Sequence, residues 1–69
     1  MRDYSFFIED ARYAVPTLKF VVAKDLMRAK ELALYELAAS PSHRAVDVYQ
    51  GERSLFRIDR PRHAWRIPT

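Results

Sequence analysis

Few side chains in this sequence could carry acid–base or nucleophilic chemistry. The bases are His43 and His63, and the hydroxyls considered beside them are Ser40, Ser42 and Ser54. A nucleophile needs a base within hydrogen-bond reach and a third group that orients the base. Because the Ser42-His43 pair follows a predicted helix and is typical of a loop, we expect no catalytic residues and a protein that is not an enzyme.

Metal and cofactor motifs are also missing from the sequence. His43 and His63 have no partner at a ligand spacing such as H-x-x-x-H, even with Asp47 or Asp59 considered as added ligands. The chain contains no cysteine, which removes disulfides, thiolate nucleophiles and cysteine-based metal sites. Its single glycine cannot form a Gly-rich phosphate loop. We therefore expect no metal and no cofactor.

Positive charge gathers at the C-terminal end of the chain. Residues 1–52 carry seven basic and eight acidic side chains, whereas residues 53–69 carry five arginines and one aspartate. The candidate basic tail consists of Arg60, Arg62, Trp65 and Arg66. Arginine combined with aromatic surface suits single-stranded nucleic acid. Because the body is slightly acidic and has no RNP-like motif, nucleic-acid binding is the alternative hypothesis and not the main one.

One predicted helix organises the rest of the chain. The segment from Asp25 to Ala39 contains no Gly or Pro, Asp25 can act as the N-cap, and Pro41 ends the helix. At 100° per residue, the stripe predicted to face the core contains Leu26, Met27, Ala29, Ala33, Leu34, Leu37 and Ala38. We expect Leu32 and Tyr35 on the far side of the helix.

Two predicted strands precede the helix and two follow it, because apolar residues alternate with polar ones in each. Pro16 stands before the second strand and favours a position at the edge of the sheet. Gln50-Gly51-Glu52 predicts a turn between the last two strands. The sheet face predicted to lie under the helix contains Tyr4, Phe6, Ile8, Leu18, Phe20, Val22, Val46, Val48, Phe56 and Ile58.

The element order ββαββ predicts an α+β fold, a four-stranded and mainly antiparallel sheet with one helix packed on one face. We expect one domain at residues 1–59 and a C-terminal tail at residues 60–69. Since Pro16 favours an edge for the second strand, we prefer the strand order 2-1-4-3 to the sequential order. A domain of this length buries only about 60% of its unfolded surface, so its core is thin.

The sheet face away from the helix is unusually apolar for a surface that meets water. The candidate interaction face consists of Phe7, Val21, Tyr49, Leu55 and Arg57. We expect a small binding or assembly module that self-associates through this face or through an edge strand such as Thr17 to Ala23. The partner is a second copy or another protein. The sequence equally allows the tail to fold back over the face within one chain.

The run from Leu18 to Asp59 resembles a group of short, uncharacterised bacterial proteins, most familiar from alphaproteobacteria. Their shared hairpin has the form V-[ED]-[VL]-[WY]-x-G-x-R, which reads here Val46-Asp47-Val48-Tyr49-Gln50-Gly51-Glu52-Arg53. At the helix start this chain is less acidic than the group. The resemblance implies a ββαββ fold and brings no known activity, cofactor or catalytic residue. A small regulatory or antitoxin-like role is a further alternative, by analogy of fold alone.

The chain shows no sign of membrane targeting. The apolar run near its start extends only from Phe6 to Ile8, which is too short for a signal peptide. A membrane-spanning helix needs about 20 apolar residues in a row. We therefore expect a soluble cytoplasmic protein that does not associate with membranes.

Overall fold

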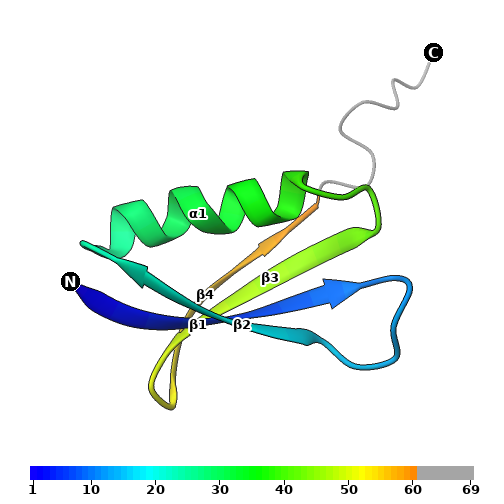
Figure 1. Cartoon of the computed structure of the whole chain (residues 1–69). Coiled ribbons are helices and arrows are strands. Elements are labelled where there is room, and N and C mark those ends of the chain that lie inside the picture. Colours follow the sequence, from blue (N-terminus) through cyan, green and yellow to red (C-terminus); the bar gives the residue numbers. More distant parts are fainter. Residues whose placement is uncertain (61–69) are drawn as a thin grey trace.

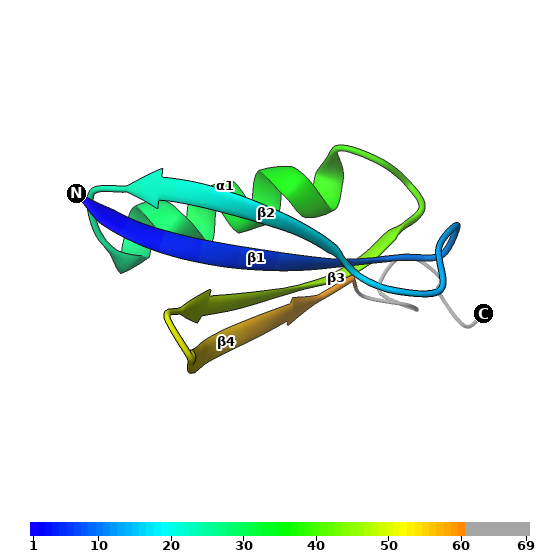
Figure 2. The same cartoon turned by 60° about the horizontal axis from the view of Figure 1, so that its bottom comes forward.

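The computed structural model describes residues 1–60, which form four strands and one helix (Figure 1). The elements are β1 (Arg2–Asp10), β2 (Thr17–Ala23), α1 (Leu26–Ala38), β3 (His43–Gln50) and β4 (Arg53–Asp59). All four strands belong to one sheet, and every neighbouring pair is antiparallel. α1 lies on one face of this sheet (Figures 1 and 2). The α+β fold with ββαββ order is therefore confirmed.

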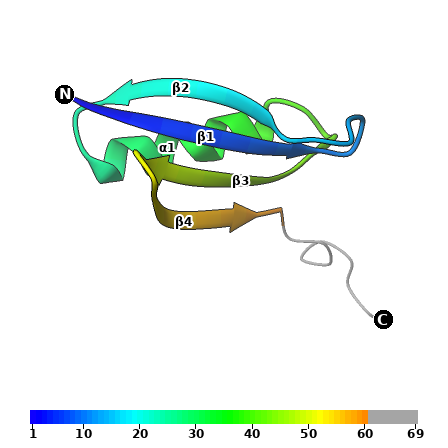
Figure 3. The same cartoon turned by 90° about the horizontal axis from the view of Figure 1, so that it is seen from below.

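The strand order is β2-β1-β3-β4, with β2 and β4 at the two edges (Figure 3). β2 lies at an edge, as Pro16 predicts, but the expected order 2-1-4-3 is wrong because β3 pairs with β1. Chain direction explains the difference. α1 follows β2 after a short connection and returns along the sheet to the end where β2 starts. β3 follows α1 after another short connection, so it starts at that same end and runs parallel to β2. β3 is then antiparallel to β1 and pairs with it.

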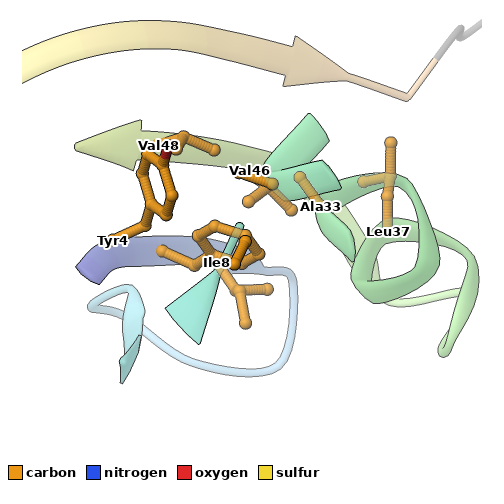
Figure 4. Close-up of a cluster of buried hydrophobic side chains, with 9 residues drawn as sticks. Tyr4, Ile8, Ala33, Leu37, Val46 and Val48 are labelled. Atoms are coloured by element: carbon orange, nitrogen blue, oxygen red, sulfur yellow. The ribbon is translucent and has the colours of Figure 1, made fainter. Parts of the chain in front are cut away.

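The hydrophobic core lies between α1 and the two central strands (Figure 4). Tyr4 and Phe6 are its largest fully buried side chains, and aromatic residues bury about 150–250 Å² each. α1 contributes mostly small residues to it, which allow the helix backbone to approach the sheet closely. The buried cluster consists of Tyr4, Phe6, Ile8, Ala23, Ala29, Ala33, Leu37, Val46 and Val48.

α1 is rotated relative to the predicted stripe. Ala29, Ala33 and Leu37 face the core as expected. Four residues predicted to face the core are exposed instead, namely Leu26, Met27, Leu34 and Ala38. Leu32, expected on the far side, packs against the core. The helix turns its alanines to the sheet because they permit the closest approach, and the larger residues on one flank then remain in solvent.

β2 turns its apolar residues to the other face of the sheet. The prediction that Leu18, Phe20 and Val22 lie under the helix is wrong. In the β1–β2 ladder Val21 stands opposite the buried Tyr4, while Phe20 stands opposite Ser5. Residues directly opposite each other lie on the same face. Lys19, Val21 and Ala23 therefore face α1, and Leu18, Phe20 and Val22 face away from it.

The β3–β4 hairpin turns at Gly51, whose φ of 63° lies in the left-handed region that favours glycine. The turn predicted at Gln50-Gly51-Glu52 is therefore confirmed. The β3–β4 pairing shifts register between Val48 and Tyr49, beside Leu55 of β4. Among residues 1–60, no helix is long and apolar enough to cross a membrane.

Candidate interaction surface on the open sheet face

The open face is the side of the sheet away from α1, and the strand register defines its residues. Across its centre, Ser5 of β1 stands between Phe20 of β2 and Tyr49 of β3. One row along, Phe7 of β1 stands between Leu18 and Asp47. These rows place apolar residues at the β2 side and charged residues toward β4. The face is therefore divided into two parts of different chemistry.

The apolar part is the β2 strip, which we define as Leu18, Phe20 and Val22. Their exposed fractions are 48%, 77% and 58%, which is high for three large apolar residues on one seven-residue strand. Phe7 extends the strip inward and makes an edge-to-face contact with Tyr49, with ring centroids 5.1 Å apart. An exposed apolar area of this kind is a candidate interaction surface.

The charged part centres on Arg57 of β4. Its Nε donates to Asp59 Oδ1 at 2.8 Å, its Nη1 to Asp47 Oδ2 at 2.9 Å and its Nη2 to Glu9 Oε1 at 3.1 Å. The hydrogen bond to Asp59, with the charges of Asp47 and Glu9, raises the pKa of Arg57 above its usual value. Three carboxylates surround one guanidinium, so this part of the face is net negative.

Three of the five residues predicted for the interaction face lie together on it. Phe7 and Tyr49 are in contact, and Arg57 lies on the same face opposite Asp47. Val21 faces α1 and packs against the core, so its assignment to the open face is wrong. Leu55 also packs against the core, because the register shift at Val48/Tyr49 breaks the alternation of β4 beside it.

The residues that sequence reasoning missed are the β2 strip itself. The alternation of Leu18, Phe20 and Val22 predicts burial because alternating apolar residues usually face the core. One signal in the sequence argues against burial of these residues. Pro16 predicts an edge strand, and a single helix covers the edge of a sheet only in part. Alternation alone therefore does not determine which side of an edge strand such as β2 faces the helix.

The predicted basic tail is divided by the structure. Arg60 belongs to the folded part: its backbone N–H donates to the Arg44 carbonyl at 2.8 Å, and its Nε donates to the His43 carbonyl at 2.7 Å. Its Nη2 donates to the carbonyls of Leu37 and Ser40 near the C-terminus of α1. These bonds satisfy acceptors that the end of a helix leaves unpaired. Arg62, Trp65 and Arg66 lie outside the described residues.

A second polar cluster joins the β1–β2 loop to the start of β3. The carboxylate of Asp10 is buried and accepts from Arg12 Nη2 at 2.9 Å and from the Arg12 backbone N–H at 2.9 Å. These bonds, assisted by Ser42, hold the pKa of Asp10 well below its usual range despite its burial. His43 Nε2 lies 3.6 Å from the same carboxylate. The Ala11 backbone N–H donates to the Ser42 carbonyl at 2.8 Å.

The serines of this region bond to each other, and His43 bonds to a backbone group. His43 Nδ1 is hydrogen-bonded to the Glu36 carbonyl, and Ser40 Oγ lies 2.8 Å from Ser42 Oγ. Within residues 1–60, no hydrogen bond joins a serine hydroxyl to His43, so a nucleophile–base pair is not formed there. Ser54 lies on β4, and His63 lies outside the described residues.

Metal binding has no geometric support in the same part of the chain. Among residues 1–60, no three His, Asp or Glu side chains are grouped in a way that could hold a metal ion. The three carboxylates around Arg57 are already neutralised in part by its guanidinium. The open face is therefore the feature from which a function can be argued.

In comparisons with known proteins, no family model, curated protein or solved structure matches this chain. The resemblance of the Val46–Arg53 hairpin to a group of bacterial proteins stays a prediction.

Proposed function

We propose that this protein is a small non-enzymatic binding or assembly module that associates with a second copy of itself through the β2 side of its open face. The observation that carries this proposal is the β2 strip. Leu18, Phe20 and Val22 project from one edge strand into solvent, beside the paired rings of Phe7 and Tyr49.

The thin core strengthens the argument for association. A single helix covers one face of the sheet and contributes only Leu37 as a large buried residue. The three residues of the β2 strip add nothing to the buried core cluster of the single chain. Burying each of them would contribute about 1.5–3 kcal/mol. Covering such a surface adds proportionally more stability to a domain of this size than to a larger domain.

The polar groups of the fold support a binding role over catalysis. Asp10, Arg12 and His43 contact one another or backbone carbonyls, and Arg57 is bound to three carboxylates. Groups held in this way stabilise the structure and are poorly placed to act on a substrate. We therefore propose no reaction for this protein.

The nucleic-acid alternative is weakened by the charge of the open face. Asp3, Glu9, Asp47 and Asp59 lie on that face, and Arg57 pairs with the last three of them. A phosphate backbone would be repelled by this excess of carboxylates next to the aromatic pair. Fluorescence anisotropy at low salt with a labelled single-stranded oligonucleotide tests the point, and we expect no binding. Saturable binding lost on replacing Phe7 would favour the alternative. Among residues 1–60, no contact or charge pattern favours a regulatory or antitoxin-like role.

Self-association is tested by sedimentation equilibrium of the full chain over a wide concentration range. We expect a monomer–dimer equilibrium that the F20T substitution weakens by about tenfold or more, since a buried Phe contributes about 1.5–3 kcal/mol. The matched control is Y35Q, because Tyr35 of α1 is also a largely exposed aromatic residue (69%, against 77% for Phe20). A strictly monomeric protein, or a dimer weakened by Y35Q and not by F20T, would contradict the proposal.

A further inference from the structure

The two edges of the sheet differ in how well they are protected against pairing with another strand. β4 carries a register shift at Val48/Tyr49 and the charged residues Arg53, Arg57 and Asp59. Bulges and charges are the devices by which proteins block an exposed edge. β2 pairs with β1 over seven residues without a register shift. Within residues 1–60, no strand pairs with the outer side of β2.

β2 carries one charged side chain, and that charge is already partnered. Lys19 faces the helix side of the sheet and its Nζ contacts the carboxylate of Glu36 on α1. The other six residues of β2 are uncharged. Pro16, which cannot donate a backbone hydrogen bond, precedes the strand and lies outside it. Within residues 1–60, the outer edge of β2 is therefore regular, uncharged on the open face and not paired with another strand.

The sequence of β2 is complementary to itself in the antiparallel register that pairs all seven of its residues. With Phe20 opposite Phe20 of a second copy, Leu18 stands opposite Val22 and Val22 opposite Leu18, all on the open face. On the helix side, Lys19 stands opposite Val21, and Thr17 opposite Ala23. A register centred on Lys19 would place two like charges directly opposite each other, which is destabilising.

We propose that two copies of this chain pair along β2 in antiparallel orientation, with Phe20 on the two-fold axis. The proposal rests on the proposed self-association and specifies its geometry. The result is a continuous eight-stranded sheet with both helices on one face. On the other face, the cross-strand contacts between Phe20 and Phe20 and between Leu18 and Val22 cover part of each β2 strip. The shared interface is isologous, as a two-fold dimer requires.

The charges on the helix side are compatible with this arrangement. The two Lys19 side chains become diagonal neighbours across the axis, a spacing at which long side chains still interact. Each lysine brings its own Glu36, so each positive charge near the axis is already paired with a carboxylate of its own chain. The contact seen within one chain thus prevents the repulsion that two unpaired lysines would produce.

Cysteine cross-linking tests the register directly, because the natural chain has no cysteine. Residues directly opposite across a ladder have Cα atoms about 4.5–5.5 Å apart, within the range that a disulfide spans. F20C alone is therefore expected to form a disulfide-linked dimer under mild oxidation. L18C and V22C are each expected to stay unlinked alone, because equivalent residues are then about 14 Å apart. Mixed together, L18C and V22C are expected to cross-link, and these variants keep Phe20 in place.

The control for a different dimer is S5C, which lies on the open face one strand inward from Phe20. In the edge-paired dimer the two copies of residue 5 are about 14 Å apart and do not cross-link. A dimer in which S5C links, while F20C and the L18C–V22C mixture do not, would overturn the edge pairing and leave the proposed self-association standing. A chain that is monomeric in sedimentation would overturn both.

Discussion

Lys19 of β2 contacts Glu36 of α1, and this pair joins the edge strand to the flank of the helix. The contact is possible only because Lys19 lies on the same face of the sheet as Tyr4 and Phe6. The same alternation that turns Lys19 toward α1 turns Phe20 away from it. The Lys19–Glu36 pair beside the core and the exposed β2 strip therefore both follow from the orientation of β2.

The Lys19–Glu36 pair is expected to contribute little to stability. Both side chains are partly exposed, with 53% of Lys19 and 20% of Glu36 accessible. Pairs of this kind contribute about 0.2–1 kcal/mol. A double-mutant cycle with K19M and E36Q, measured by urea unfolding at low protein concentration, should give a coupling free energy in that range. A coupling above about 2 kcal/mol would mean that the pair, and not the core, holds β2 in its orientation.

Phe6 and Phe20 are expected to differ sharply when replaced by alanine. Phe6 is fully buried in the core, whereas Phe20 is largely exposed on the open face. F6A should reduce the free energy of unfolding by about 3–5 kcal/mol, enough to unfold so small a domain. F20A should change the monomer's stability by less than about 0.5 kcal/mol. Circular dichroism during urea unfolding, at concentrations where the chain is monomeric, separates the two. Equal losses would place Phe20 in the core.

Asp10 is expected to make the protein sensitive to acid. Its folded-state pKa is lowered by the hydrogen bonds from Arg12. A lowered folded pKa contributes stability above the unfolded value of about 3.9, and this contribution is lost as the pH falls below it. D10N should therefore be less stable than the natural chain at pH 7, and its stability should fall less between about pH 4 and pH 2. Unfolding free energies measured across this range test both effects. Parallel pH profiles for the two proteins would contradict the assignment.

Arg60 is expected to hold the C-terminal end of α1. R60A removes bonds to the carbonyls of His43, Leu37 and Ser40, and hydrogen bonds from charged donors contribute about 1.5–3 kcal/mol. R60K is the matched control, because it keeps the charge but lacks the planar fork that reaches several acceptors at once. We expect R60K to recover less than half of the loss, measured as the free energy of unfolding. Full recovery would mean that charge alone matters at this position.

The candidate site was only partly predictable from the sequence. Phe7, Tyr49 and Arg57 lie on the open face as predicted, because β1, β3 and the second half of β4 keep a regular alternation around a well-covered core. Val21 and Leu55 were misplaced, and the β2 strip was missed. Val21 and the β2 strip belong to an edge strand, where one helix covers too little of the sheet for alternation to identify the inner face. Leu55 lies at the register shift that breaks the alternation of β4.

Local chemistry in the sequence determined the elements of this protein. Period-two alternation predicts the strands, Asp25 and Pro41 bound the helix, and Gly51 marks the turn whose φ is positive. The tertiary structure decided which residues share a face. Alternation defines two sides of a strand but does not say which side is covered, and the answer depends on register, chain direction and the reach of α1. Those non-local constraints brought Lys19 to Glu36 and left Phe20 exposed on the open face.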